Sequence, residues 1–186
     1  MQIKEIFIKE YTTDEDAVDV EEHLAQGDEL RTEIPRIQSP LPGLEVRQDS
    51  DSGTVWDFYI YKNKSCIANF SIQPQDNIFG NLLAEGVMPM IPHMVVDPRY
   101  QGQGLSTRCY LLFLNNRWHS SFNYTEWVLS TQYQSPNAAR LWSSIARQPG
   151  YIDFYYDRRT QKISQTPTDS NYRFVGPKSR FNFVSQ

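Results

Sequence analysis

Hydrophobic and polar residues alternate along several short stretches of this 186-residue chain. Alternation with a period of two is typical of a strand that has one buried face. It predicts a hairpin with its turn at 62–64, and further strands on either side of that hairpin. The predicted strands are 3–8, 54–61, 65–72, 91–96, 126–130, 151–156 and 181–184.

Hydrophobic residues recur at helical spacing in three other segments. The first helix is predicted to begin after the acidic, helix-capping residues at 12–16 and to end at Gly27. The others are predicted at 105–118 and at 136–147, where Pro136 suits the first turn. This order predicts an α/β fold of the α+β type, in which helices flank a central mixed sheet. It does not predict an even βαβ series. Irregular segments are predicted at 35–53 and 74–90, and no structure is assigned to 157–180.

Composition narrows the class of protein. The chain is 39% hydrophobic and 22% charged, which is typical of a globular domain. No stretch approaches the roughly 18 apolar residues of a membrane span, and the first ten residues do not resemble a secretory signal. Cys66 and Cys109 form no CxxC motif and no metal-ligand cluster. We therefore expect a cytoplasmic protein with one domain over 1–186, no metal and no membrane partner.

Charge is distributed unevenly along the chain. Residues 1–60 carry 5 basic and 15 acidic side chains, a balance of −10, whereas residues 61–186 carry 13 basic and 7 acidic, a balance of +6. This pattern does not predict a nucleic-acid partner. Nine acids and one base lie between Asp14 and Glu33, which fits either a cationic partner or a solvated helix face.

A glycine-containing turn lies between the predicted strand 91–96 and the helix that follows it. The segment 95–107 reads VVDPRYQGQGLST, with glycines at 102 and 104. Glycine permits close backbone approach, and a helix N-terminus attracts anions. A plain strand-to-helix turn has the same pattern. The segment is neither a P-loop, which needs G-K-[ST], nor a dinucleotide-binding G-x-G-x-x-G after the first strand.

Two segments together resemble the GNAT superfamily of acyl-CoA-dependent N-acyltransferases. That family has V-x-P followed by [QR]-x-x-G-x-[GA], and this chain has VDP at 96–98 and QGQGLS at 101–106. The family's N-x-x-A-x-x-L-[YW] is echoed by SPNAARLW at 135–142. The strong match covers 91–142. The resemblance implies the GNAT acyl-CoA N-acyltransferase fold, a cofactor-binding core at about 91–147 and acetyl-CoA as the acyl donor.

The resemblance also implies which residues contact the cofactor. Backbone amides after the strand would hold the pyrophosphate, basic side chains would meet other phosphates, and the strand itself would pair with pantetheine. The implied residues are Met94, Val95, Val96, Arg99, Gln101, Gly102, Gln103, Gly104, Leu105, Ser106, Thr107, Ser135, Asn137 and Arg140. Three residues depart from the family pattern: Ser106 in place of Gly or Ala, Ser135 in place of Asn, and Trp142 in place of a Tyr acid.

Catalytic candidates follow from the same resemblance. His93 stands where several family members have a carboxylate base, and a histidine titrates near neutral pH; the alternative is a half-buried structural histidine. Tyr133 and then Tyr151 are the candidate acids, or else packing aromatics. His23 and His119 have no such placement and are interpreted as surface or packing residues.

The predicted activity is transfer of acetyl from acetyl-CoA to a primary amine by direct attack in a ternary complex. The acceptor would be a cationic small molecule, or a protein lysine or N-terminus. The resemblance is compatible with a homodimer. The alternatives are a non-catalytic acyl-CoA-binding or protein-interaction module on the same fold, and an enzyme for another donor such as succinyl-CoA, with Arg158 and Arg159 near its carboxylate.

Overall fold

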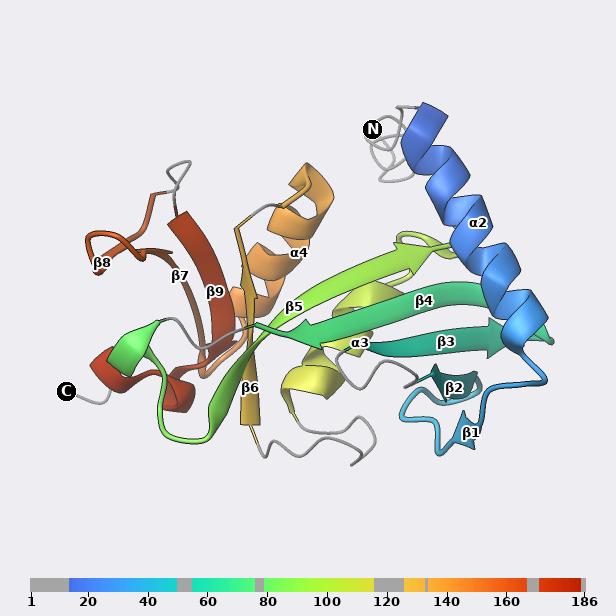
Figure 1. Ribbon diagram of the computed structural model, residues 1–186, viewed down its shortest axis with the longest axis horizontal. Coiled ribbons are helices and arrows are strands. Elements are labelled where there is room, and N and C mark those ends of the chain that lie inside the picture. The colour runs from blue at the N-terminus through green and yellow to red at the C-terminus, as the bar shows by residue number, and fades with distance from the viewer. Residues whose placement is uncertain are drawn as a thin grey trace. The chain divides into compact units, whose positions relative to one another are not determined.

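A computed structural model describes residues 14–49, 55–75, 79–115, 126–132, 134–166 and 171–184 of the chain. These residues form nine strands in the order β1-β2-β3-β4-β5-β6-β9-β7-β8, together with three α-helices (Figure 1). Strands β5 and β6 pair in parallel, whereas β1–β2, β2–β3, β3–β4, β6–β9, β7–β8 and β7–β9 are antiparallel pairs. The predicted mixed sheet is therefore confirmed.

The chain divides into two compact units, residues 1–72 with 93–112 and residues 73–92 with 113–186. Strand β5 contributes its first half to the second unit and its second half to the first. The single domain expected over 1–186 stays a prediction. The described residues include no helix that is long and apolar enough to cross a membrane.

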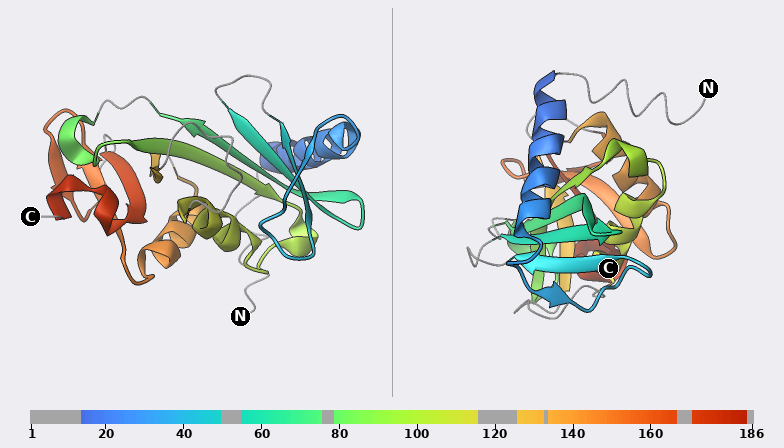
Figure 2. Two further views of the ribbon diagram at one scale, coloured as in Figure 1. Left: turned by 90° about the horizontal axis from the view of Figure 1, so that it is seen from below. Right: turned by 90° about the vertical axis from the view of Figure 1, so that its right-hand side faces the viewer.

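The first unit is an antiparallel sheet with a helix on each face. Its strands are β1 (Arg36–Ile37), β2 (Glu45–Asp49), β3 (Trp56–Lys62), β4 (Ser65–Pro74) and the end of β5 (Val87–Val96). The predicted hairpin is confirmed as β3 and β4, whose turn holds Asn63 and Lys64 at positive φ. Helix α2 (Asp14–Leu30) lies on one face and α3 (Leu105–Leu114) on the other (Figure 2). The 3-10 turn η2 (Pro98–Tyr100) connects β5 to the glycine turn.

Gly27 does not end the first helix, contrary to the prediction. Helix α2 continues to Leu30, and a Cβ on Gly27 would lie 2.6 Å from the Cys66 Sγ and 2.8 Å from the Tyr59 Cδ1. The Tyr61 hydroxyl donates a 2.6 Å hydrogen bond to the Gly27 carbonyl. The absence of a side chain therefore lets α2 approach the sheet closely.

The second unit contains the remaining strands and α4 (Pro136–Ala146). Its strands are the first half of β5, β6 (Glu126–Thr131), β7 (Tyr151–Asp157), β8 (Lys162–Ser164) and β9 (Asn171–Pro177). Its core is aromatic, with the Phe79 ring edge-on to that of Phe174 at 4.9 Å and the Phe154 ring stacked on Phe174 at 5.5 Å. Short 3-10 turns lie at η1 (Gly80–Leu82), η3 (Lys178–Arg180) and η4 (Asn182–Val184).

Several element boundaries differ from prediction. The segment predicted to be irregular at 35–53 contains β1 and β2, and β5 begins at Val87 inside the segment 74–90. The strand predicted at 181–184 is wrong, because Phe181 makes only an isolated bridge to Leu83 and η4 follows it. The segment 157–180 contains β8 and β9. The strand predicted at 3–8 lies outside the described residues, as do Tyr133 and His119.

Candidate active site

The glycine turn joins the end of β5 to the start of α3 in the first unit. Gly102 and Gly104 have φ of +71° and +75°, a region that L-residues with side chains rarely adopt. A Cβ on either glycine would meet no atom within 4 Å. Backbone conformation, not crowding, therefore favours glycine at both positions, and the space beside them is open.

The backbone N–H groups of this turn are not used by the rest of the described structure. Within the described ranges, no hydrogen bond is donated by the N–H groups of residues 102–107, and the first such bond runs from the Arg108 N–H to the Gly104 carbonyl at 3.0 Å. The first turn of a helix leaves its N–H groups without internal partners and carries about half a positive charge. Residues 102–104 are exposed and Ser106 and Thr107 are half-buried. The geometry fits an anion such as a pyrophosphate.

The side chains around the turn hold its shape. The Gln101 Nε2 donates to the Val96 carbonyl at 3.0 Å, and the Gln103 Nε2 donates to the Arg99 carbonyl at 3.1 Å. These hydrogen bonds occupy both glutamine side chains and stabilise the turn. The Gln101 backbone N–H donates to the Pro98 carbonyl at 3.4 Å, so of the two glutamines Gln103 keeps its backbone N–H for the predicted cofactor contact.

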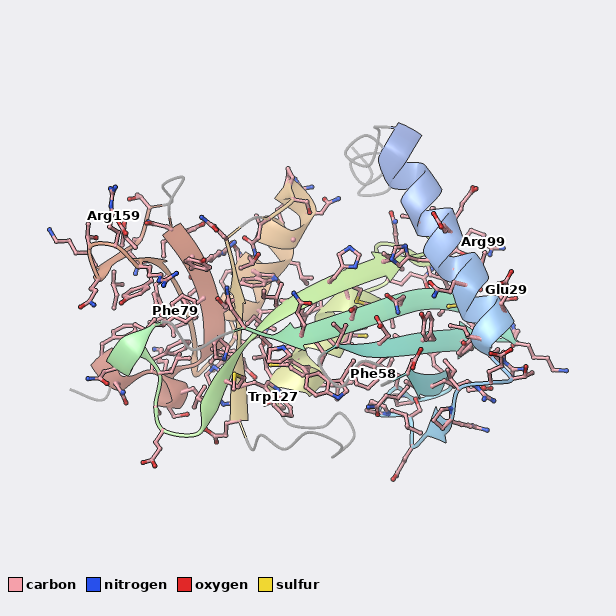
Figure 3. All side chains as sticks on the ribbon, in the orientation of Figure 1. Glu29, Phe58, Phe79, Arg99, Trp127 and Arg159 are labelled. Carbon is pink, nitrogen blue, oxygen red and sulfur yellow. The ribbon has the colours of Figure 1, made fainter. Side chains whose placement is uncertain are left out.

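The Asp97 carboxylate holds Arg99 in place ahead of the glycine turn. This buried carboxylate accepts from the Arg99 backbone N–H at 2.8 Å and pairs with the Arg99 Nη2 at 2.6 Å. Hydrogen bonds from the Arg99 guanidinium hold the pKa of Asp97 below its usual value. The Arg99 side chain is 76% exposed, so it is bound to Asp97 and still accessible to a phosphate (Figure 3).

Lys62 is a cation beside the turn that was not predicted from the sequence. The Lys62 Nζ lies 5.1 Å from the centre of the Tyr100 ring, next to Gln101 and Gly102 in the chain. Lys62 is at the end of β3, 38 positions before Tyr100. No motif relates the two residues, because only the β3–β4 hairpin brings Lys62 to the end of β5.

The second half of β5 carries the predicted catalytic histidine and the predicted pantetheine-binding residues. The parallel ladder with β6 runs only from Val87 opposite Glu126 to Met90 opposite Leu129, so the backbone of Met94–Val96 lies beyond it. His93 is exposed, and its ring centre lies 6.0 Å from that of His23 on α2. His23, interpreted from sequence as a surface or packing residue, is thus beside the candidate base.

The remaining predicted residues lie in the second unit. The Ser135 hydroxyl caps α4 by accepting from the Ala138 N–H at 3.2 Å, and Asn137 accepts a hydrogen bond from the Arg140 guanidinium. Trp142 is buried, with 2% of its surface exposed. These bonds show local structural roles for Ser135 and for the Asn137–Arg140 pair.

Tyr151 is the candidate acid that the structure describes. Its hydroxyl donates to the Asn115 Oδ1 at 3.1 Å, and burial raises its pKa. A phenol is protonated at neutral pH, as a proton donor requires, and the raised pKa makes Tyr151 a weaker acid than a free phenol.

Comparisons with known proteins give structural likenesses only. No family model and no curated protein matches the sequence. A spermidine N-acetyltransferase SpeG chimera from Vibrio cholerae and hSSAT is 13% identical, with a TM-score of 0.41 over 68% of this chain and 69% of that one. A GNAT-family acetyltransferase from Streptococcus pneumoniae is also 13% identical, with a TM-score of 0.36 over 84% of this chain and 91% of that one.

Proposed function

We propose that this protein is an acyl-CoA-dependent N-acetyltransferase that transfers acetyl from acetyl-CoA to a primary amine. The observation that carries the proposal is the strand–glycine turn–helix at 93–108, with its positive-φ glycines and with N–H groups at 102–107 that donate no hydrogen bond within the described residues. These groups would hold the pyrophosphate of the donor, and Arg99 and Lys62 would add charge. The Met94–Val96 backbone beyond the β6 ladder would pair with pantetheine in the manner of an added strand.

His93 is proposed as the base in this reaction. An ammonium acceptor has a pKa near 10.4 and must lose a proton before its nitrogen attacks the thioester carbonyl. The C–N bond then forms and the C–S bond breaks. The departing thiolate takes a proton from water or a phenol, for which Tyr151 and Tyr133 are the candidates. His93 is exposed, so it can exchange its proton with solvent.

One observation favours a second candidate, a non-catalytic acyl-CoA-binding module. The Ser135 hydroxyl, at the position where the family has a pantetheine-binding Asn, is engaged in the α4 cap. This module would bind CoA and release none from acetyl-CoA with any amine.

The test is CoA release from acetyl-CoA with a panel of primary amines, for the wild type, His93→Ala and Arg158→Ala. The exposed Arg158 in the β7–β8 turn provides the control. We expect His93→Ala to lower kcat at least roughly tenfold and to remove the acidic limb of the pH profile, because acid–base groups contribute about 10²–10⁴. An unchanged kcat would refute the role of His93. CoA binding without turnover by any amine would favour the module.

A further inference from the structure

Four polar residues lie side by side across the first unit, one on each of four neighbouring strands. Asp49 on β2 is directly opposite Asp57 on β3, and Asp57 is directly opposite Ser71 on β4. The Asp97 N–H donates to the Ile67 carbonyl at 2.9 Å, which sets an antiparallel register in which Ser71 faces His93 on β5. We refer to Asp49, Asp57, Ser71 and His93 as the polar row.

The polar row is on the sheet face that α2 covers. Tyr59 contacts α2 at Gly27, and Asp57 is two residues before Tyr59 on the same strand, so their side chains share a face. Burial, and then the charges of Asp57 and Asp49, raise the pKa of Tyr59 to about 12. At the other end of the row, the His93 ring lies beside the His23 ring of α2.

The acidic end of the row brings two like charges together. Carboxylates directly opposite each other on antiparallel strands repel and destabilise the pair. Among the described residues, no lysine or arginine forms an ion pair with Asp57. Asp49, Asp57 and Ser71 are half-buried, so a ligand in solvent can reach them.

A buried amide next to the row also lacks a partner. Asn69 is opposite Tyr59, one pair away from the row on the same face, and 2% of its surface is exposed. Within the described residues its Nδ2 makes no hydrogen bond. Buried amides are almost always satisfied. The Nδ2 is a hydrogen-bond donor, and a half-turn of the amide puts the Oδ1, which can accept from an ammonium group, at that position. An ammonium group on this face would therefore supply both a counter-charge for Asp57 and a donor for the Asn69 amide.

We propose that the polar row binds a di- or polyamine acceptor, with the reacting nitrogen at His93 and a second ammonium group at Asp57 and Asp49. This inference rests on the proposed function for the role of His93. Neighbouring strands are about 4.8 Å apart, so two strand spacings separate His93 from Asp57 by about 10 Å. The row therefore selects acceptors whose second ammonium lies about that far from the reacting nitrogen.

The experiment measures amine binding by calorimetry, with α,ω-diamines of increasing length and monoamines of matched carbon number. The proteins are the full chain, Asp57→Asn and Glu85→Gln. The last removes one charge from the exposed turn before β5 and serves as the control. CoA release with the same amines is measured in parallel.

Diamines of the favoured length are expected to bind about tenfold more tightly than matched monoamines, as a charge-assisted hydrogen bond allows. Asp57→Asn removes this preference, and Glu85→Gln keeps it. Because Asp57→Asn also relieves repulsion, the free variant is expected to melt no lower than the wild type. A diamine preference that survives in Asp57→Asn, equal affinity for both amine series, or a lower Tm for Asp57→Asn would overturn the proposal.

The two proposals fail in different ways. Acetylation of monoamines and diamines at equal rates, unaffected by Asp57→Asn, refutes the polar row and leaves the acetyltransferase intact. Selective diamine binding without CoA release supports the row and refutes the proposed activity.

Discussion

Replacing Arg173 with methionine tests how the second unit holds α4 in place. The Arg173 side chain is 5% exposed and extends from β9 to groups on three other segments. Its Nη1 donates to the Gln134 Oε1 at 2.9 Å and to the Ala139 carbonyl at 3.0 Å. Its Nη2 donates to the Ser143 Oγ at 2.7 Å and to the Asp153 Oδ2 at 2.5 Å.

The size of the effect follows from the charge that is left behind. Removing one partner of a buried ion pair costs about 3–5 kcal/mol, because the other charge stays desolvated. The Asp153 side chain is 31% exposed, so water compensates part of the loss. We therefore expect Arg173→Met to lower the free energy of unfolding by about 2–4 kcal/mol. For a chain of this length that lowers Tm by roughly 5–12 °C.

The assay is urea unfolding followed by circular dichroism. Arg159→Met is the control, because Arg159 is exposed in the turn after β7 (Figure 3). Adding Asp153→Asn to Arg173→Met removes the unpaired charge and should recover about half of the lost stability. If Arg173→Met costs no more than Arg159→Met, the bonds to Arg173 do not fix α4 as described.

Three further predictions concern the first unit. Gly104→Ala places a side chain at φ +75° and should lower the free energy of unfolding by about 1–2 kcal/mol and weaken acetyl-CoA binding. Gly104→Asn should lower it less, because asparagine tolerates this region. Equal thermal shifts for the two variants would contradict the role given to backbone conformation. Gly27→Ala should lower the free energy of unfolding by about 1–3 kcal/mol, because the added Cβ overpacks against the Cys66 Sγ. Adding Cys66→Ala to the same chain should relieve this clash, so the two changes should not be additive. Strictly additive unfolding energies would contradict the predicted clash. Asp97→Asn should lower the free energy of unfolding at pH 7, because a carboxyl whose folded pKa is depressed contributes stability while it is ionised. This loss should shrink as the pH falls below the unfolded pKa of about 3.8 and through the lower folded pKa. A loss that is independent of pH in urea unfolding would contradict this assignment.

Local patterns were sufficient for part of the fold. Alternating hydrophobic and polar residues predicted the β3–β4 hairpin, and Pro136 marked the first turn of α4. Gly102 and Gly104 likewise marked the glycine turn. All three signals are local in the sequence. Strand β2 was missed because EVRQD has one hydrophobic residue, Val46, and buries Gln48. The first half of β5 was missed because Pro89 and Pro92 interrupt it.

Other features depend on contacts between distant parts of the chain. Strand β9 contains the buried Arg173, whose partners lie on α4, on β7 and at Gln134, so its sequence does not resemble a core strand. Gly27 reads as a helix end, and only its contact with Cys66 shows the close approach of α2. The places of Lys62 and His23 in the candidate site follow from strand register and helix packing, for which the sequence has no periodic signal.

The central claim is that the strand–glycine turn–helix at 93–108 binds an acyl-CoA. The most direct test is a thermal-shift titration with acetyl-CoA, CoA and ATP in parallel. A ligand at about 100 times its Kd stabilises the native state by about 2.7 kcal/mol, which is roughly 5–10 °C for a chain of this length. Shifts with acetyl-CoA and CoA, and a much smaller one with ATP, are predicted. No shift with CoA, or an equal shift with ATP, would contradict the claim.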